Sequence, residues 1–431
     1  MTALGTESKT RGFAVALDRR PEEEIVEEFA RYVSPSKVAA YRQLGLPVVP
    51  GRREGVRMWD WEGKRSFINL RSSGGVFNLG HRPPRIMAAL RQAMEDFDVG
   101  DHILMSERRA ALARRLEELM PGDITYTAFA ASGGEAIDIA LKLARGRTGR
   151  PGVISADVGY HGHTGLALAA TAGFGELFGP LAPGFVKVPF GDFEALERTA
   201  GPDTAAVIME TIPATAGMLI PPDDYYPRLR RLCDELAAVM IIDEVQAGLG
   251  RTGRLWAIDE WGVVPDIMVL GKGMSGAIYP ISATCFRPHL QAFFDSDPFV
   301  HISTYGGADL GCVACLAMLD QITEPGFLEH VQEMGDRFAD GFDRLQEQHP
   351  AILTGVRQRG LMIGLEMASD ACGPLMTRAM GEHGVIAIFS HLRPSSLQIM
   401  PPLIIEADEV DEVLDALDAS LGEVARTLGL T

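Results

Sequence analysis

The chain has 431 residues, of which 46 % are hydrophobic and 23 % are charged, proportions typical of a globular protein with a large core. Its formal net charge of −18 argues against nucleic acids and anionic membrane surfaces as general partners. The chain has five scattered cysteines, and its N-terminal stretch lacks an apolar signal core. It also lacks any apolar run near the roughly 18 residues of a membrane span. These features together favour a cytoplasmic protein.

The N-terminal part of the chain is polar and predicts helices followed by a hairpin. Glu22–Tyr32 has the pattern of an amphipathic helix, and we expect Pro35 and Pro47 to stop helices in this region. Met58–Leu70 alternates polar and apolar residues around a turn, as a β-hairpin does. The glycine-rich stretch Ser72–Gly80 suits a loop beside a ligand.

From Ile124 onward, short apolar segments alternate with helical patterns. The expected strands are Thr125–Ala130, Val153–Ala156, Ala205–Met209, Val239–Ile242, Ile267–Leu270, Ile281–Thr284, Gly360–Met367 and Val385–Ile388. The expected helices around and between them include Pro84–Asp96, Ser106–Leu119, Gly134–Arg145, Asp223–Ala238, Phe327–Gln348 and Ala407–Leu428. This alternation predicts an α/β fold with a mostly parallel, doubly wound central sheet. We expect a large domain at about 71–320 and a smaller domain built from 1–70 and 321–431.

Two chemically active side chains follow neighbouring apolar strands. Val239–Ile242 runs into Asp243, and Ile267–Leu270 ends just before Lys272. Ligands of open α/β sheets bind at the carboxyl ends of the strands. Lys272 is also the only lysine after Lys187, although arginine is frequent there. Lysine can lose its proton when buried and can form an imine, whereas arginine can do neither.

A helix start follows the strand that ends at Ala130. Ser132 is a good N-cap residue, and Glu135 three residues later completes a capping box. Gly133 and Gly134 leave backbone N–H groups open to an anion, so the segment is either a phosphate site or simply a capped helix.

Two further segments have both a functional and a structural interpretation. Tyr160-His161-Gly162 follows a strand, and its aromatic ring either stacks on a flat ligand or packs in a loop. Glu210 ends another strand and is either an active-site acid or a charge at the rim of the site.

Two motif matches are rejected. GLGRTG, Gly248–Gly253, has the glycine spacing of a dinucleotide fingerprint, but it does not directly follow its strand, and Asp266 opens the next strand instead of closing it. Cys312 and Cys315 form a CxxC at helical spacing in an apolar segment, which favours two core thiols over a redox or metal pair. We expect no metal site.

The remaining features fit one cofactor, pyridoxal 5′-phosphate. Lys272 forms the imine, and Asp243 pairs with the pyridinium nitrogen so that the ring can accept electrons. At an effective dielectric constant near 20, such a pairing contributes about 4 kcal/mol at 4 Å. The freed lysine then moves a proton as general base and acid.

The chain resembles the class III aminotransferases, which are fold type I pyridoxal-phosphate enzymes. The resemblance covers nearly the whole chain, and the motifs that carry it are SGGEA (Ser132–Ala136), YHGHT (Tyr160–Thr164), IIDEVQAGLGRTG (Ile241–Gly253), GKGMSG (Gly271–Gly276), STYGG (Ser303–Gly307) and MPPL (Met400–Leu403).

The resemblance implies a role for each matching residue. Lys272 is then the Schiff-base lysine, and Asp243 holds the pyridine nitrogen with Glu210 beside it. The other implied cofactor contacts are Val245 and Tyr160 on the two ring faces, His161 next to Tyr160, Gln246 at the phenolic oxygen, Ser132, Gly133 and Gly134 at the phosphate, and Thr304 at the phosphate of the neighbouring subunit. The last contact implies a homodimer with shared active sites.

The departures from the family pattern concern the substrate. Many members that act on amino acids carry arginine where His163 stands, glutamate at Thr215 and arginine at Gln398. The last two form a pair in which arginine holds an α-carboxylate and glutamate otherwise neutralises the arginine. Here both are absent, so no buried charge is left alone. The pattern predicts a substrate without an α-carboxylate, such as a primary amine or an amino sugar, unless another arginine, for example Arg393, has taken over.

Amino transfer between an amine donor and a carbonyl acceptor is the leading functional hypothesis. YHGHT also resembles the glutamate-1-semialdehyde aminomutases of the same class, so an aminomutase or an epimerase at an amine-bearing carbon stays open. A non-catalytic scaffold on this fold is the third hypothesis, and the presence of all the expected site residues argues against it.

Overall fold

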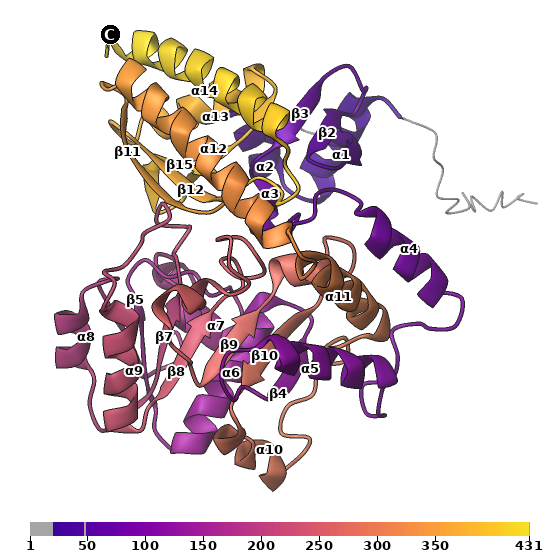
Figure 1. Cartoon of the computed structure of the whole chain (residues 1–431), viewed down its shortest axis with the longest axis vertical. Helices are drawn as coiled ribbons and strands as arrows, with labels where there is room; N and C mark the ends of the chain where they lie inside the picture. Colours follow the sequence, from indigo (N-terminus) through magenta and orange to yellow (C-terminus); the bar gives the residue numbers. More distant parts are fainter. Residues whose placement is uncertain (1–19, 47–48, 431) are drawn as a thin grey trace, which may run out of the picture.

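The computed structural model describes residues 20–46 and 49–430, and a seven-stranded sheet forms its centre (Figure 1). The strand order is β4-β10-β9-β8-β7-β5-β6, and only β10 runs antiparallel to its neighbours. The strands are β4 (Tyr126–Ala130), β5 (Gly152–Ala156), β6 (Phe185–Val188), β7 (Thr204–Glu210), β8 (Val239–Asp243), β9 (Ile267–Leu270) and β10 (Ser282–Phe286). The predicted α/β fold with a mostly parallel sheet is confirmed.

Helices cover both faces of this sheet. Successive residues of β8 enter different apolar clusters: Met240 and Ile242 pack on one face, and Val239 and Ile241 on the other. Burial on both faces explains why these strands are continuous apolar runs. The helices of this part are α4 (Pro84–Ala93), α5 (Glu107–Leu119), α6 (Gly133–Thr148), α7 (Gly165–Ala170), α8 (Phe193–Thr199), α9 (Tyr225–Leu236), α10 (Ala292–Ser296) and α11 (Asp309–Ile322), with short 3₁₀ turns η1 (Gly175–Leu177), η2 (Ala257–Trp261), η3 (Lys272–Ser275) and η4 (Pro288–Leu290).

The two chain ends meet in a smaller part, drawn at the top of Figure 1. It holds two four-stranded sheets, β1-β2-β3-β13 and β11-β12-β15-β14, and β13 pairs with β3 in parallel. The strands are β1 (Pro50–Glu54), β2 (Arg57–Asp60), β3 (Ser66–Asn69), β11 (Leu353–Arg359), β12 (Met362–Met367), β13 (Val385–Ile386), β14 (Ile388–Ser390) and β15 (Arg393–Ile399). The helices are α1 (Glu22–Tyr32), α2 (Pro35–Gln43), α12 (Phe327–Gln348), α13 (Cys372–Glu382) and α14 (Ala407–Leu428). The short helix α3 (Ser72–Gly75) follows β3 and contacts η3 of the larger part.

A separate apolar cluster fills this smaller part. It draws Ile68 and Leu70 from one chain end and Phe338, Leu397 and Leu417 from the other. Shared burial of this kind motivates our proposal that 71–320 forms one domain and that 1–70 with 321–431 forms the other. In the described part of the chain, no helix is both long and apolar enough to span a bilayer.

The predicted stop at Pro35 is confirmed, since α1 ends at Tyr32, and the same proline has a second role. Pro35 begins α2, because a proline in the first helical turn lacks only an N–H that would have no partner there. The Ser34 hydroxyl caps the same turn by accepting a hydrogen bond from the Lys37 N–H, 3.3 Å away. Pro47 lies outside the described residues.

Candidate active site

Asp243 and Lys272 lie at the carboxyl ends of the parallel strands β8 and β9. Lys272 has a backbone φ of 44°, a left-handed conformation that is uncommon for a residue with a side chain. Its Nζ donates a hydrogen bond to Gln246 Oε1, 2.9 Å away. Burial lowers the pKa of Lys272, and the charges of Asp243 and Glu210 oppose that shift. The amine is therefore held in a fixed direction and is easier to deprotonate than a free lysine.

Both oxygens of the buried Asp243 carboxylate have fixed partners. Oδ2 lies 2.8 Å from His161 Nδ1, and Oδ1 accepts the Val245 N–H at 3.0 Å. Because a carboxylate accepts hydrogen bonds, His161 Nδ1 carries the hydrogen. The His161 backbone is fixed in turn by its N–H bond to Thr171 Oγ1, 2.9 Å away. Asp243 is thus oriented before any ligand binds.

Glu210 lies directly opposite Asp243 in the register of β7 and β8. Its Oε2 accepts the Tyr160 N–H at 2.8 Å, so this acid positions the backbone that carries the aromatic ring. Burial raises the pKa of Glu210 to about 7, and the negative charge of Asp243 adds to the shift. Glu210 is buried, which excludes the rim position that the sequence left open.

The start of α6 is capped as predicted on one side only. Ser132 Oγ accepts the Glu135 N–H at 3.3 Å. The Glu135 carboxylate, however, accepts the N–H of Ala131 at 2.8 Å instead of that of Ser132, so the predicted reciprocal capping box is wrong.

The next two residues present backbone N–H groups at the helix start. Gly133 and Gly134 are the first residues of α6, where N–H groups have no acceptor within the helix. A Cβ on Gly134 would lie 2.9 Å from Thr164 Oγ1, so the close approach of the Thr164 loop requires glycine there. The positive end of the helix dipole adds to the attraction for an anion.

These residues surround a cavity of about 190 Å³. Its lining consists of Gly133, Gly134, Tyr160, His161, Gly162, Glu210, Asp243, Val245, Gln246 and Lys272. A neighbouring cavity of about 340 Å³ shares Gly133 and Lys272 and includes Ser132. An anion-binding helix start, an oriented carboxylate, an aromatic ring and a lysine amine fit the phosphate, pyridine ring and aldehyde of pyridoxal phosphate.

The predicted substrate residues Thr215 and Gln398 lie close together. Gln398, on β15, donates from Nε2 to the carbonyl of Ala214 and to Ser390 Oγ, both 3.0 Å away. Ala214 directly precedes Thr215. The two positions that carry opposite charges in many relatives are therefore adjacent here, and neither side chain is charged.

His163 belongs to a row of rings beside Tyr160. Its ring centroid lies 5.5 Å from that of Tyr160 and 4.8 Å from that of Phe174, which stacks on His391 at 5.3 Å. This row connects the cofactor side of the site with the turn between β14 and β15.

Thr304 is apart from these residues. It is exposed and does not line either cavity at Lys272. The single chain therefore does not test its predicted contact with the phosphate of a neighbouring subunit.

The two rejected motif matches have structural roles. Gly248–Gly253 forms turns and does not open an α-helix. Its Arg251 is buried and donates to the carbonyl of Pro401. Cys312 and Cys315 are free, buried thiols in the core around α11, as predicted.

The family model for class III aminotransferases matches residues 38–421. The chain belongs to the class III aminotransferases. Members of this family depend on pyridoxal phosphate, in agreement with the chemistry of the cavity.

Relatives of this class III aminotransferase support the assignment over nearly the whole chain. An uncharacterized aminotransferase of Archaeoglobus fulgidus is 48 % identical over 404 residues, which cover 94 % of this chain and 95 % of the relative. The ornithine aminotransferase of Toxoplasma gondii ME49 has a TM-score of 0.87 at 28 % identity, covering 95 % of this chain and 97 % of that one. An (S)-enantioselective omega-transaminase of Thermomicrobium roseum has a TM-score of 0.85 at 28 % identity, covering 94 % and 99 %.

The sequence did not reveal Glu244, which supports the candidate site of this aminotransferase without lining its cavity. Glu244 is buried and accepts hydrogen bonds from Thr211 Oγ1 and from the N–H groups of Ala257 and Ile258. It thereby fixes the loop that carries Val245 and Gln246. Glu244 directly follows Asp243 at the end of an apolar strand, and this position could have indicated that it lies near the site.

Proposed function

We propose that this class III aminotransferase acts on a primary amine or amino sugar that lacks an α-carboxylate. The observation that carries the proposal is the uncharged pair at Gln398 and Thr215. Both hydrogen bonds of the Gln398 amide nitrogen go to protein acceptors. An uncharged amide that is already paired offers an α-carboxylate no compensation for its lost hydration.

The alternative was that Arg393 replaces the missing arginine. Arg393 is engaged by Glu366, whose oxygens lie 3.0 and 2.9 Å from its Nε. Glu366 also accepts from Arg357 and from Ser395, and these donors lower its pKa although burial acts in the opposite direction. Binding a substrate carboxylate would require Arg393 to leave this network, which argues against the alternative.

The residues around the first cavity suit amino transfer. When bound, pyridoxal phosphate supplies an aldehyde for the amine and a ring that withdraws electrons from the substrate carbon. Lys272, oriented by Gln246, is placed to remove and return a proton as general base and acid. Asp243 holds a negative charge in a fixed position, and Gly133 and Gly134 offer N–H groups to the phosphate.

Gln398→Arg is expected to shift the substrate preference toward α-amino acids. A new guanidinium can make charge-assisted bonds to an α-carboxylate, which are worth about 1.5–3 kcal/mol, or roughly tenfold or more in kcat/KM. The measurement compares kcat/KM for an α-amino acid and for the amine that lacks its carboxylate. Gln398→Leu is the control, because it removes the same two hydrogen bonds without adding charge. The proposal fails if α-amino acids are already the best substrates and Gln398→Arg leaves their turnover unchanged.

The reaction type has its own test. A screen of amine donors, followed through the visible absorption of the cofactor, should show bleaching together with release of a ketone or aldehyde. Racemisation of the substrate, or retention of all nitrogen in one product molecule, would instead indicate the epimerase or aminomutase that YHGHT left open.

We also propose a homodimer in which Thr304 contributes to the partner's site. Thr304 is flanked by exposed apolar side chains: Phe299 is 58 % exposed, Ile302 54 % and Tyr305 59 %. Contiguous exposed apolar side chains of this kind mark interaction surfaces. Light scattering should give twice the chain mass, and Ile302→Glu should weaken the dimer and lower activity together, whereas Val186→Glu, on strand β6, should do neither. An active monomer would contradict the proposed homodimer.

The cytoplasmic location stays a prediction.

A further inference from the structure

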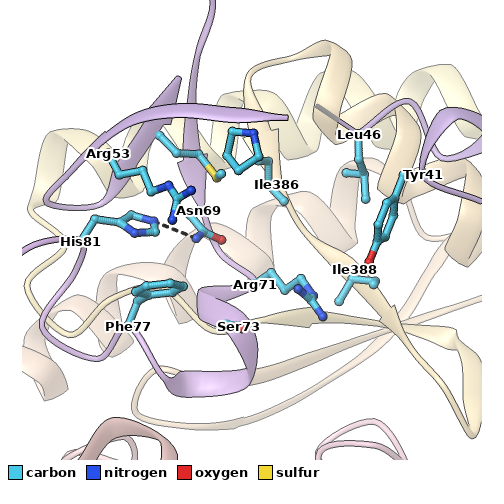
Figure 2. Close-up of a pocket in the computed structure, with 12 residues that line it drawn as sticks. Tyr41, Leu46, Arg53, Asn69, Arg71, Ser73, Phe77, His81, Ile386 and Ile388 are labelled. Atoms are coloured by element: carbon cyan, nitrogen blue, oxygen red, sulfur yellow. Dashed lines mark hydrogen bonds between the residues drawn. The ribbon is translucent and has the colours of Figure 1, made fainter. Parts of the chain in front are cut away.

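A cavity of about 290 Å³ lies in the smaller part of the protein (Figure 2). It is lined by residues of both chain ends: Tyr41, Leu46, Pro50, Arg53, Met58, Asn69, Arg71, Ser73, Phe77, His81, Ile386 and Ile388. None of these residues is acidic, in a chain whose net charge is −18.

Two arginines face this cavity without a counterion. Figure 2 shows the guanidinium groups of Arg53 and Arg71 turned toward it, the first near the His81–Asn69 pair and the second near Ile388. Neither side chain makes a hydrogen bond or an ion pair with another described residue, whereas other arginines of the smaller part, such as Arg57 and Arg357, bind carboxylates. Two unpaired cations beside one cavity are an electrostatic arrangement for an anion.

The floor of the cavity is rigid and uncharged. Asn69 Oδ1 accepts the Ser72 N–H at 3.1 Å, which sets the orientation of the amide and lets Nδ2 donate to His81 Nε2 at 3.0 Å. Burial lowers the pKa of His81 to about 4, with a contribution from the charge of Arg53. His81 is therefore neutral and does not compete with the arginines for an anion.

The lining of the cavity adjoins the Lys272 site along two paths of neighbouring residues. Ser73 lines it, and the next residue, Gly74, has no side chain. A Cβ there would lie 3.5 Å from Lys272 Cε and 3.5 Å from Gln246 Nε2. Residues 73 and 74 therefore join the lining of the cavity to the surroundings of Lys272 and Gln246.

The second path runs along one face of β14 and β15. Ile388, which lines the cavity, is the direct cross-strand partner of Gln398. Met400 follows two residues after Gln398, and its Sδ accepts from Gln246 Nε2 at 3.4 Å. Directly paired residues of neighbouring strands point to the same side of a sheet, so Ile388 and Gln398 share one side. Met400, just beyond the end of β15, then contacts Gln246 of the Lys272 site.

We propose that Arg53 and Arg71 bind an anionic group, a carboxylate or a phosphate, at the end of the substrate remote from its amine. The inference rests on the proposed function, because a substrate without an α-carboxylate leaves its charge to be recognised elsewhere. The substrate then lies with its amine at Lys272, its middle along Gln398 and Ile388, and its charged end between the two guanidinium groups.

The test uses primary amines of graded chain length, each in three forms: a neutral alkylamine, the same chain with a terminal carboxylate and the same chain with a terminal phosphate. At the length that spans the two sites, the holoenzyme should prefer an anionic form over the neutral one by about tenfold or more in kcat/KM. The better of the two anionic forms identifies the source of the charge.

Arg71→Gln and Arg53→Gln should each remove most of this preference by raising KM about tenfold while kcat changes little, because the contact is remote from the reacting atoms. Arg71→Lys should retain part of it. Arg231→Gln, which removes an exposed arginine of α9 that does not line the cavity, should have no effect. Neutral and anionic amines that react equally well at every length would overturn this inference alone. Turnover confined to α-amino acids would overturn the proposed function and the inference with it.

Discussion

Replacing Lys272 with alanine is expected to lower amino transfer by at least about 10³-fold. In the proposed function, this amine bonds the cofactor and then moves the proton, and general acid–base catalysis by one positioned side chain alone contributes about 10²–10⁴. No other lysine lies among the residues that line the cavity. The loss should therefore not be compensated from within the site.

The same variant should lose the visible absorption of the covalently bound cofactor. In the unmodified protein, borohydride treatment followed by mass mapping should place a pyridoxyl group on Lys272. Lys64→Ala, which removes an exposed lysine paired with Glu62, is the matched control and should keep both the absorption and the activity. A pyridoxyl group found on any other residue would refute the assignment of Lys272, and with it the role of the cavity.

The central strands could be predicted because their environment leaves a simple pattern. Strands β8 and β9 are buried over their full length, so their apolar runs are continuous and the first polar residues mark their ends. Parallel pairing then brings Asp243 and Lys272 to one edge of the sheet. Strands that are only partly surrounded by apolar residues were not predicted. Strand β6 lies at the edge of the central sheet. Strand β15 has the sequence RPSSLQI, and its Gln398 donates hydrogen bonds to Ala214 and Ser390.

The supporting contacts of the site could not be predicted, because they join distant segments. His161 and Asp243 are 82 positions apart, and Arg251 and Pro401 are 150 positions apart. No local periodicity encodes such pairs, since they depend on how strands and loops pack after the sheet has formed. The cavity at Arg53 and Arg71 was missed for the same reason: its lining comes from separate segments of the chain, of which only Ser72–Gly80 was expected to lie beside a ligand.

Asp243→Asn should also cause a large loss, about 10²–10³-fold in kcat. A carboxylate near a protonated pyridine nitrogen is worth about 4 kcal/mol at 4 Å and an effective dielectric constant of 20, and 1.36 kcal/mol corresponds to a factor of ten in rate. Asparagine keeps the shape but removes the charge. It also turns an N–H₂ group toward either His161 Nδ1 or the Val245 N–H, both of which are donors. One buried donor is then left without an acceptor.

The measurement combines kcat with the absorption spectrum and with cofactor retention on dialysis. Because the charge is the main contribution, the variant should still bind cofactor through Lys272 while turnover falls. His161→Gln separates charge from orientation: it leaves the carboxylate in place and removes only the contact at Oδ2, so its loss should be smaller than that of Asp243→Asn. If Asp243→Asn kept kcat within about threefold of the unmodified enzyme, the carboxylate at the end of β8 would have no electrostatic role, and its hydrogen bond with His161 would be structural only.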